Sequence, residues 1–392
     1  MRKKRISLPI IAQVLVAMLM GICIGWFMPN WFIRIFVTFN EFFGQFIGFL
    51  VPLIILALVT AAIANTEQNA GRMLSITLAI VFISTIGSGL FSYCLGDLVL
   101  PHFIAPDDRV MMEPQHGGTF APYFSFQLPP ALDVMTALVL ALMLGLGIRS
   151  SSAVGLKKGI VELQDVVMLS IEKALIPLLP IYIFGIFLHM SATGEAFGLI
   201  RSFLIVLLLV IFVQLMWVLL LYLSAAIMTG RNPMKMIWHM MPAFVFAFAT
   251  SSSAATIPIT LKSARKLDVR EESSNFVIPM CANLHIPGLT IHVVLCSMAL
   301  MFFVGQPADL ATLIAFILML SVTCVATPGI PGGSVAVLPV LATILDFPPQ
   351  LQAICLSLCI AMDAPITASN VLCDGAVCAM VDRLAFKPSS TD

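Results

Sequence analysis

The sequence predicts an all-α, polytopic membrane protein with eight transmembrane helices and two re-entrant helical hairpins. Of its 392 residues, 60% are apolar and only 10% are charged, whereas a soluble domain usually spends about a quarter of its residues on charged side chains. So few charges cannot cover a water-facing surface, and lipid must therefore surround most of the protein. The 20 basic and 20 acidic residues balance, which excludes an overall field that would attract nucleic acid.

Apolar runs separated by polar or Pro/Gly clusters define the predicted crossings, each with the roughly 20 residues that a bilayer requires. The eight runs are 8–28, 40–65, 74–103, 131–149, 168–192, 202–229, 275–304 and 349–381. The first follows a basic pentapeptide, but it is long enough to span and has no small-residue cleavage site, so we expect a retained helix rather than a signal peptide. The nine cysteines lie in apolar stretches without a Cys-x-x-Cys pair, which predicts neither disulfides nor a metal site.

Two further apolar segments, 236–261 and 310–345, are broken in the middle. The sequence Thr-Ser-Ser-Ser at 250–253 interrupts the first, and a Pro/Gly-rich stretch at 327–334 interrupts the second. Such breaks leave unpaired backbone at membrane depth, which is tolerated only where it is buried in protein or lines a wet cavity. Two of them in comparable places predict re-entrant hairpins around a binding site.

The distribution of basic residues orients this topology. With the N-terminus inside and both hairpins re-entrant, 16 of the 20 basic residues are cytoplasmic, three are external and Lys173 lies in the fifth crossing. The external three are Arg34, Arg109 and Arg201. This asymmetry satisfies the positive-inside rule, so we expect both termini in the cytoplasm. The polar loop 105–130 is expected to be a mobile external segment.

The last predicted crossing carries the strongest functional signal. Asp363, Thr367, Asn370 and Asp374 follow one another at intervals of four, three and four residues, which puts them on one face of a helix. A carboxylate at the bilayer centre costs a few kcal/mol, so this stripe must face a cavity, an ion or a partner. The alternative is a pair of acids near the helix ends that reach the interface.

Prolines inside two crossings are expected to free backbone carbonyls for a cation. Pro365 cannot donate to the carbonyl of Ala361, and Pro287 cannot donate to that of Asn283. Gly288 weakens the helix beside Pro287, so local unwinding is expected there. The candidate cation-binding residues are Asn283, His285, Asn370 and Asp374. His285, beside the break, could carry a coupling proton if it faces the cavity, whereas His292 is interpreted as a packing residue.

The two hairpin tips supply the other candidates. The serines at 251–253 offer hydroxyls at a half-helix N-terminus, whose free amides and positive dipole suit a carboxylate, unless they form an ordinary polar turn. The glycine-rich tip would serve as an external gate, unless it is a plain loop outside the membrane. The candidate gate residues are Gly329, Pro331, Gly332 and Gly333. The candidate substrate-binding residues are Ser251, Ser252, Ser253, Ile330, Ser334, Asp363, Thr367 and Asn370.

These residues resemble those of the dicarboxylate/amino acid:cation symporters, the family of the glutamate transporters and of bacterial serine/threonine carriers. The resemblance covers nearly the whole chain, and its specific motifs are the two hairpin tips and the polar stripe. It implies a homotrimer in the inner or plasma membrane that works by an elevator mechanism. Residues 1–230 would be mainly scaffold and trimerisation helices. Within this range the third crossing would contribute to the transport domain, and the same assignment stays open for the sixth. Residues 236–381 would form the core of the transport domain, and 382–392 a cytoplasmic tail.

Carried over residue by residue, the resemblance favours a neutral amino acid. It assigns Asp363 to the substrate ammonium, and Asn370 to the substrate and a cation site. Relatives that take acidic amino acids place an arginine on the last helix or just before the hairpin serines, and here those positions are Ile366 and Thr250. A second carboxylate on the substrate would therefore stay unpaired.

The seventh crossing departs from the family pattern, because Asn-Met-Asp-Gly-Thr becomes His-Ile-Pro-Gly-Leu at 285–289. Pro287 replaces the sodium-binding acid, so at least one cation site is expected to be lost, while Asp374 and Asn370 remain. Coupling would then use fewer sodium ions, or a proton on His285.

The expected function is cation-coupled symport of a small neutral amino acid, with Na⁺ or H⁺ as coupling ion, no cofactor and no enzymatic activity. Two alternatives stay open, namely a carrier of dicarboxylates or acidic amino acids, and a transport-inactive relative that serves as a sensor or scaffold. An intramembrane hydrolase built from one of the serines at 251–253 with His285 is disfavoured, because neither a Gly-x-Ser-x-Gly context nor a third partner accompanies them.

Overall fold

A computed structural model of the chain describes residues 10–386, except 65–70, 104–119, 126, 131, 133, 152, 171–172, 175, 194–195, 306–308 and 325–332. The helices are α1 (Ile10–Gly25), α2 (Asn30–Ala64), α3 (Gly71–Phe103), α4 (Val134–Ser151), α5 (Val154–Ser170), α6 (Ile176–Thr193), α7 (Ala196–Thr229), α8 (Pro233–Thr250), α9 (Ser253–Ala264), α10 (Glu271–Leu284), α11 (Pro287–Phe303), α12 (Leu310–Cys324), α13 (Leu338–Ile344), α14 (Pro349–Ala361) and α15 (Asp363–Ala385), with short 3-10 turns η3 (Arg265–Leu267) and η4 (Gly333–Val337). The described part of the chain contains no strand, which confirms the all-α class.

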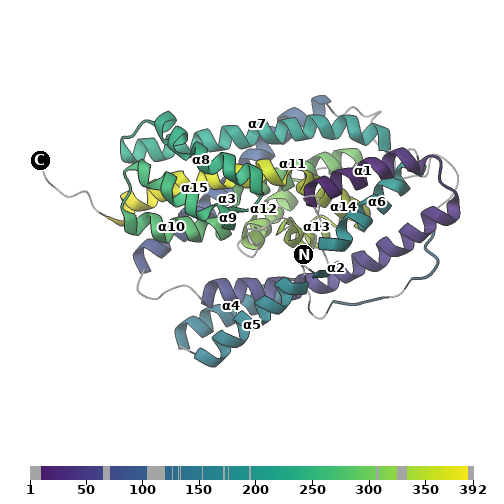
Figure 1. The fold of residues 1–392 in the computed structure, drawn as a ribbon, viewed down its shortest axis with the longest axis horizontal. Helices are drawn as coiled ribbons and strands as arrows, with labels where there is room; N and C mark the ends of the chain where they lie inside the picture. The colour runs from purple at the N-terminus through teal and green to yellow at the C-terminus, as the bar shows by residue number, and fades with distance from the viewer. Residues whose placement is uncertain are drawn as a thin grey trace, which may run out of the picture.

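The helices pack as two groups. In the first, α1 packs along α6, and α2 packs against α4, α5 and α6. In the second, α15 is surrounded by α3, α7, α8, α9, α10 and α11. α12 packs against α3 and α11, α14 packs against α11, and α13 contacts α12 and α14. Figure 1 shows α2 along one long side of the molecule, α7 along the other and α15 between them. The groups meet where α14 touches α1 and α6, and where α13 touches α2.

Four stretches among the described residues are long and apolar enough to cross a bilayer, judged by length and composition. They are Arg72–Phe103, Leu204–Thr229, Glu271–Phe303 and Asp363–Ala385. In the first two, fewer than half of the residues are buried, which suits lipid, whereas the last two are buried almost throughout. The helices that carry the predicted site therefore have protein, rather than lipid, around them.

α5 occupies a segment where the sequence predicts only a basic cytoplasmic loop. Its residue Ile160 packs in a small apolar cluster with Ala61 and Ala64 of α2. On its outer side Lys158 and Glu162 form an exposed ion pair at 3.8 Å. Because charges alternate with the apolar positions, this helix forms no continuous apolar run, and a search for such runs misses it.

The last predicted crossing, 349–381, is two helices instead of one. α14 ends at Ala361 and α15 begins at Asp363, with Met362 between them at φ −98° and ψ 10°. Pro365 consequently lies in the first turn of α15, where a helix leaves its amides unpaired in any case. The prediction of one continuous crossing over 349–381 with Pro365 in its interior is therefore wrong, since the chain is interrupted at Met362, before the proline.

The described parts of the loop that was predicted to be external, 120–125 and 127–130, lie along α2 and are bonded to it. The amide of Tyr123 donates to the hydroxyl of Thr38 at 2.9 Å, and the amide of Leu128 donates to Oε1 of Gln45 at 2.7 Å. The expectation of a mobile segment is wrong for this part of the loop, because side chains of α2 bond its backbone.

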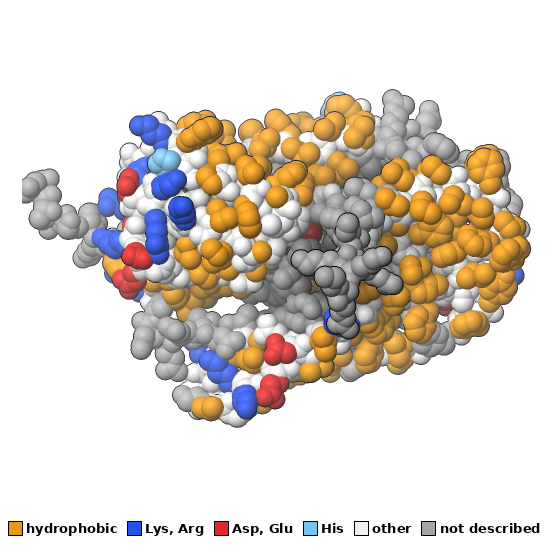
Figure 2. Space-filling view, in the orientation of Figure 1, with side chains coloured by type: hydrophobic (Ala, Val, Ile, Leu, Met, Phe, Trp, Pro, Cys, Tyr) orange, Lys and Arg blue, Asp and Glu red, His pale blue; other side chains and the backbone are white. Residues whose placement is uncertain are grey.

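Charged side chains gather at one end of the molecule on the face shown in Figure 2, while hydrophobic side chains cover much of the rest. At this end Arg265 pairs with Glu271 at 2.7 Å, and Arg270 lies 3.6 Å from Asp382. Asp382 also accepts from the hydroxyl of Ser273 at 2.7 Å. The ends of α9, α10 and α15 are thus held together by polar contacts.

We predict that Gly21→Leu destabilises the contact between α1 and α6. A Cβ atom at Gly21 would lie 2.8 Å from the carbonyl oxygen of Phe184 and 2.9 Å from the amide nitrogen of Leu188. Backbone atoms cannot turn away, and such overpacking costs about 1–3 kcal/mol. Thermal unfolding of the purified protein should show a lower midpoint for this variant. Gly147→Leu, at a position with nothing within 4 Å, should leave the midpoint unchanged, and equal effects of the two would contradict the prediction.

Candidate functional site

The serine-rich segment forms the junction between α8 and α9. Ser251 ends α8 in the left-handed conformation, at φ 49° and ψ 32°, and its amide donates to the carbonyl of Ala247 at 2.8 Å. Ser252 is the N-cap of α9, and its hydroxyl accepts from the amide of Ala255 at 3.2 Å. Ser251 and Ser253 are buried. The junction therefore places the positive end of a helix dipole beside two buried serines.

The seventh predicted crossing is interrupted beside its proline. α10 ends at Leu284 and α11 begins at Pro287, and the two residues between them, His285 and Ile286, have φ angles of −108° and −126°. Pro287 takes the first position of α11, where its missing amide is not needed. The predicted local break is confirmed.

The break lets the side chain of His285 meet α15 and α3. Its Nδ1 lies 3.0 Å from Oδ1 of Asp374, and its Nε2 lies 2.9 Å from the hydroxyl of Ser84. All three side chains are buried, with exposed fractions of 0%, 1% and 4% for His285, Asp374 and Ser84. When the carboxylate of Asp374 is ionised it only accepts hydrogen bonds, and Nδ1 is then the donor. Two predicted cation-binding residues thus lie together, bonded to each other.

Asn370 ties the start of α11 to α15. Its Oδ1 accepts from the amide of Gly288 at 2.8 Å, and the carbonyl of Gly288 accepts from Nε2 of Gln214 at 3.1 Å. A Cβ atom at position 288 would collide with the hydroxyl of Ser369 and would lie 2.9 Å from Oδ1 of Asn370. Glycine is therefore needed for this close approach.

Asp363 and Thr367 lie in the first turns of α15, and both are buried. Ser334 in η4 is also buried, and its hydroxyl has no hydrogen-bond partner among the described residues. A buried hydroxyl without a protein partner can form its hydrogen bond with a ligand or with water. Gly333 begins η4, and the rest of the second hairpin tip lies outside the described residues. That remainder includes Gly329, Ile330, Pro331 and Gly332.

Three other positions matter for selectivity and coupling. Ile366 is buried in the apolar core, and the hydroxyl of Thr250 donates to the carbonyl of Phe246 at 2.9 Å. Neither position presents a cation to a substrate. The exposed amide of Asn283 donates to the carbonyl of Pro279 at 3.2 Å, one turn earlier. The structure therefore places Asn283 apart from the buried polar pair.

Sequence reasoning missed Ser84 and Gln214, which complete the polar contacts around the break. Gln214 is a lone amide in a long apolar helix, and Ser84 begins a series with Ser88 and Ser92 at intervals of four residues. Polar side chains in apolar helices usually bond to neighbouring helices. This signal identifies both as candidates, but it does not identify their partners.

The order hydroxyl, imidazole, carboxylate also occurs in hydrolases. Here both ring nitrogens of His285 have partners other than the serines at 251–253, so the hydrolase alternative built on those serines is wrong. Ser84 lies inside the continuous helix α3 and is buried. It therefore lacks the exposed turn that presents a catalytic serine to a substrate.

Broken helices around a buried polar stripe, in an apolar helical protein, are the arrangement from which secondary transporters build their binding sites. The sequence matches the sodium:dicarboxylate symporter family over residues 10–384, and the chain belongs to this family. It is 24% identical to the serine/threonine transporter SstT of Acinetobacter baylyi, over 96% of this chain and 98% of that protein. It is 26% identical to the serine/threonine transporter SstT of Lacticaseibacillus casei, over 95% of this chain and 88% of that protein. The protein is a multi-pass membrane symporter and not an enzyme.

We predict that His285 and Asp374 are energetically coupled. Removing one partner leaves the other buried without its hydrogen bond, which costs about 3–5 kcal/mol. His285→Ala and Asp374→Ala should each lower the unfolding midpoint strongly, and the double variant should lose less than the sum of the two. Ser84→Ala, which removes one hydroxyl contact, should cost about 1 kcal/mol. Strictly additive losses in this double-mutant cycle would show that the pair is not coupled.

Proposed function

We propose that the protein carries a small neutral amino acid of the serine/threonine type across the plasma membrane together with sodium ions. Family membership supports the symport, and the names of both relatives support the substrate. A neutral substrate is favoured because Ile366 and Thr250 stand at the two positions where an arginine could pair with a carboxylate on the substrate's side chain, and neither is cationic. A dicarboxylate would therefore bury an unpaired charge.

In the proposed site each substrate group has a matching protein group. Asp363 would bind the ammonium group through charge-assisted hydrogen bonds. The start of α9, at Ser253, would bind the carboxylate through its amides and the positive end of the helix. Thr367 and Asn370 would contact the substrate from the same face of α15. Ser334 and Ile330 would cover it from the second hairpin, with the glycines of that tip as the gate.

We further propose that the two groups of helices are the two domains of an elevator. The group of α1, α2, α4, α5 and α6 would be the scaffold, which would also form the homotrimer. The packing of α3 and α7 against α11 and α15 supports their place in the transport domain with residues 236–381. The basic residues at the end shown in Figure 2 support a cytoplasmic position for that end, where α15 ends. The basic run at 2–5 supports a cytoplasmic N-terminus.

We propose that coupling at Asp374 is altered. Hard cations such as sodium prefer oxygen ligands, and here the imidazole of His285 occupies one oxygen of Asp374. The second carboxylate oxygen and the backbone at the break would remain for a cation. The alternative coupling ion is a proton carried along the chain from Ser84 through His285 to Asp374, which the two ring contacts favour.

Uptake of radiolabelled serine and threonine into proteoliposomes tests the function. We expect accumulation driven by an inward sodium gradient, with unlabelled serine or threonine competing and with aspartate or malate competing weakly. Accumulation driven by a pH gradient in the absence of sodium would assign the coupling to a proton. Strong competition by malate would support a dicarboxylate carrier, and no uptake under any gradient would support a transport-inactive relative.

We predict that Thr250→Arg increases the affinity for acidic amino acids. A guanidinium at the end of α8 could pair with a side-chain carboxylate, which adds about 1.5–3 kcal/mol for a charge-assisted hydrogen bond. Competition by aspartate against labelled serine should improve about tenfold or more. Thr250→Met, which has a long uncharged side chain, should not change the affinity for aspartate relative to that for serine. If neither variant changes the affinity for aspartate relative to serine, position 250 does not determine selectivity.

A further inference from the structure

A cavity of about 660 Å³ lies between the two groups of helices. Its walls come from α2 and α6 on one side and from α13 and α14 on the other, and Phe120 and Pro122 line it as well. None of the lining residues belongs to the polar stripe, the serine-rich junction or the break at His285. Cavities of about 300–1,000 Å³ hold small organic molecules. The cavity is therefore large enough for a ligand and separate from the candidate substrate site.

Most of the amide side chains in the wall already bond within the protein. Oε1 of Gln45 accepts from the amide of Leu128 at 2.7 Å, and Nε2 of Gln352 donates to the carbonyl of Phe347 at 2.6 Å. Asn40, with its amide group oriented to satisfy both atoms, bonds to the backbone of α6. These contacts fix the orientation of the amide groups in the wall.

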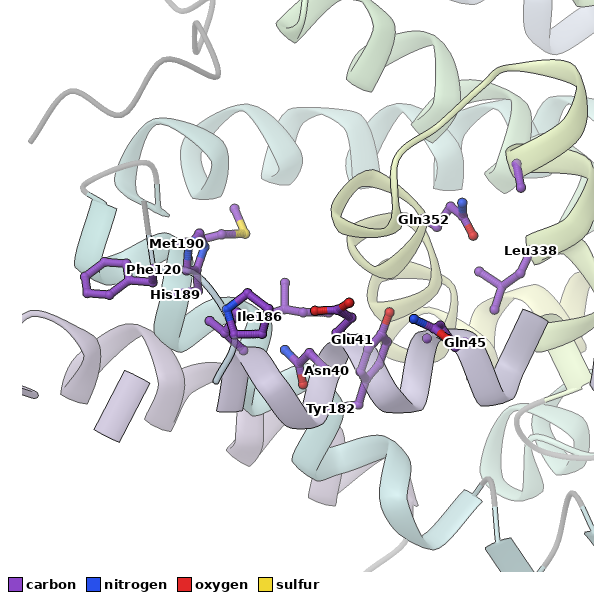
Figure 3. Close-up of a pocket in the computed structure, with 14 residues that line it drawn as sticks. Asn40, Glu41, Gln45, Phe120, Tyr182, Ile186, His189, Met190, Leu338 and Gln352 are labelled. Atoms are coloured by element: carbon purple, nitrogen blue, oxygen red, sulfur yellow. The ribbon is translucent and has the colours of Figure 1, made fainter. Parts of the chain in front are cut away.

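Glu41 is different. Its carboxylate lies in the wall, between α2 and α14 in Figure 3, and has no hydrogen bond or ion pair with any described residue. Arg34, also on α2, stacks on the ring of Tyr123 at 4.3 Å. A carboxylate in an otherwise mostly apolar cavity wall is best satisfied by a cationic group.

We propose that this cavity binds an amphipathic amine, with its ammonium group on Glu41 and its apolar body against Tyr182, Ile186 and Leu338. The lining residues include no lysine or arginine, and their one histidine, His189, packs edge-on against Phe120. A carboxylic acid, a phosphate or a zwitterionic amino acid would therefore bring a negative group next to Glu41 without a lysine or arginine to pair it. A primary amine on an aromatic or aliphatic body satisfies both the charge of Glu41 and the apolar wall.

An amine in the cavity would touch both groups of helices and hold them in the arrangement of this structure. Transport would therefore be inhibited without competition for the amino acid site. This consequence rests on the proposed elevator function, whereas binding of the amine does not.

Isothermal titration calorimetry with tryptamine on the purified full-length protein tests the binding. Tryptophol, which has a hydroxyl in place of the ammonium group on the same ring system, is the matched ligand control. We expect tryptamine to bind and tryptophol to bind about tenfold more weakly or not at all, because only the amine pairs with Glu41.

Two variants locate the site. Glu41→Gln should weaken tryptamine about tenfold, whereas Glu162→Gln, which removes an acid from the outer side of α5, should not. Gly44→Leu should abolish binding of both ligands, because it adds a side chain in the cavity wall. A Cβ atom at Gly44 meets only the hydroxyl of Tyr182, at 3.8 Å, so the variant is expected to fold. Unfolding midpoints without ligand check that each variant is intact.

Equal affinity for tryptamine and tryptophol, or unchanged binding in Glu41→Gln and Gly44→Leu, would overturn the proposal. In the uptake assay tryptamine should lower the maximal rate for serine and leave the half-saturating concentration unchanged. Competitive inhibition would place the amine in the substrate site instead. If the protein transports no amino acid, calorimetry still decides the binding, so the two proposals fail independently.

Discussion

Polar groups at the hydrocarbon depth of a membrane protein must find partners inside the protein, and the carboxylate of Asp374 shows how far this requirement shapes the molecule. Asp374 lies on α15, a helix with neighbours on nearly all sides. Its partner, His285, reaches it from the interruption between α10 and α11, and Ser84 completes the chain from α3. The break, the burial of α15 and the polar chain therefore depend on one another.

Close packing around α15 follows from the same requirement. Helices in a membrane gain little from the hydrophobic effect between them, so they associate through small residues and interhelical hydrogen bonds. A Cβ atom at Gly375 would lie 2.7 Å from the hydroxyl of Tyr222, which donates to the carbonyl of Leu372 at 2.8 Å. Gly288 allows a similar approach to Asn370. Glycines thus occur at the positions where α7 approaches α15 closely and where α15 approaches the start of α11.

Local patterns predicted a large part of this arrangement. The spacing of the polar stripe predicted one buried helical face, and Pro287 predicted the break beside it. The prediction failed where the signal was weak, as in the charged amphipathic helix α5, or where a residue carries no sign of an interruption, as at Met362. It also failed to find the partners Ser84 and Gln214, which lie 201 and 74 residues away from the residues that they bond.

By itself, the sequence determined that this protein lives in lipid and that a helix breaks beside Pro287, and it indicated the polar side chains of the last crossing as candidates for the site. These properties follow from hydropathy, from the missing amide of proline and from the cost of a buried charge, all of which act locally. The tertiary structure alone decided which oxygen faces which ring nitrogen, and that Glu41 lines a cavity between two groups of helices. Such pairings depend on packing between segments distant in sequence, and no local pattern encodes them.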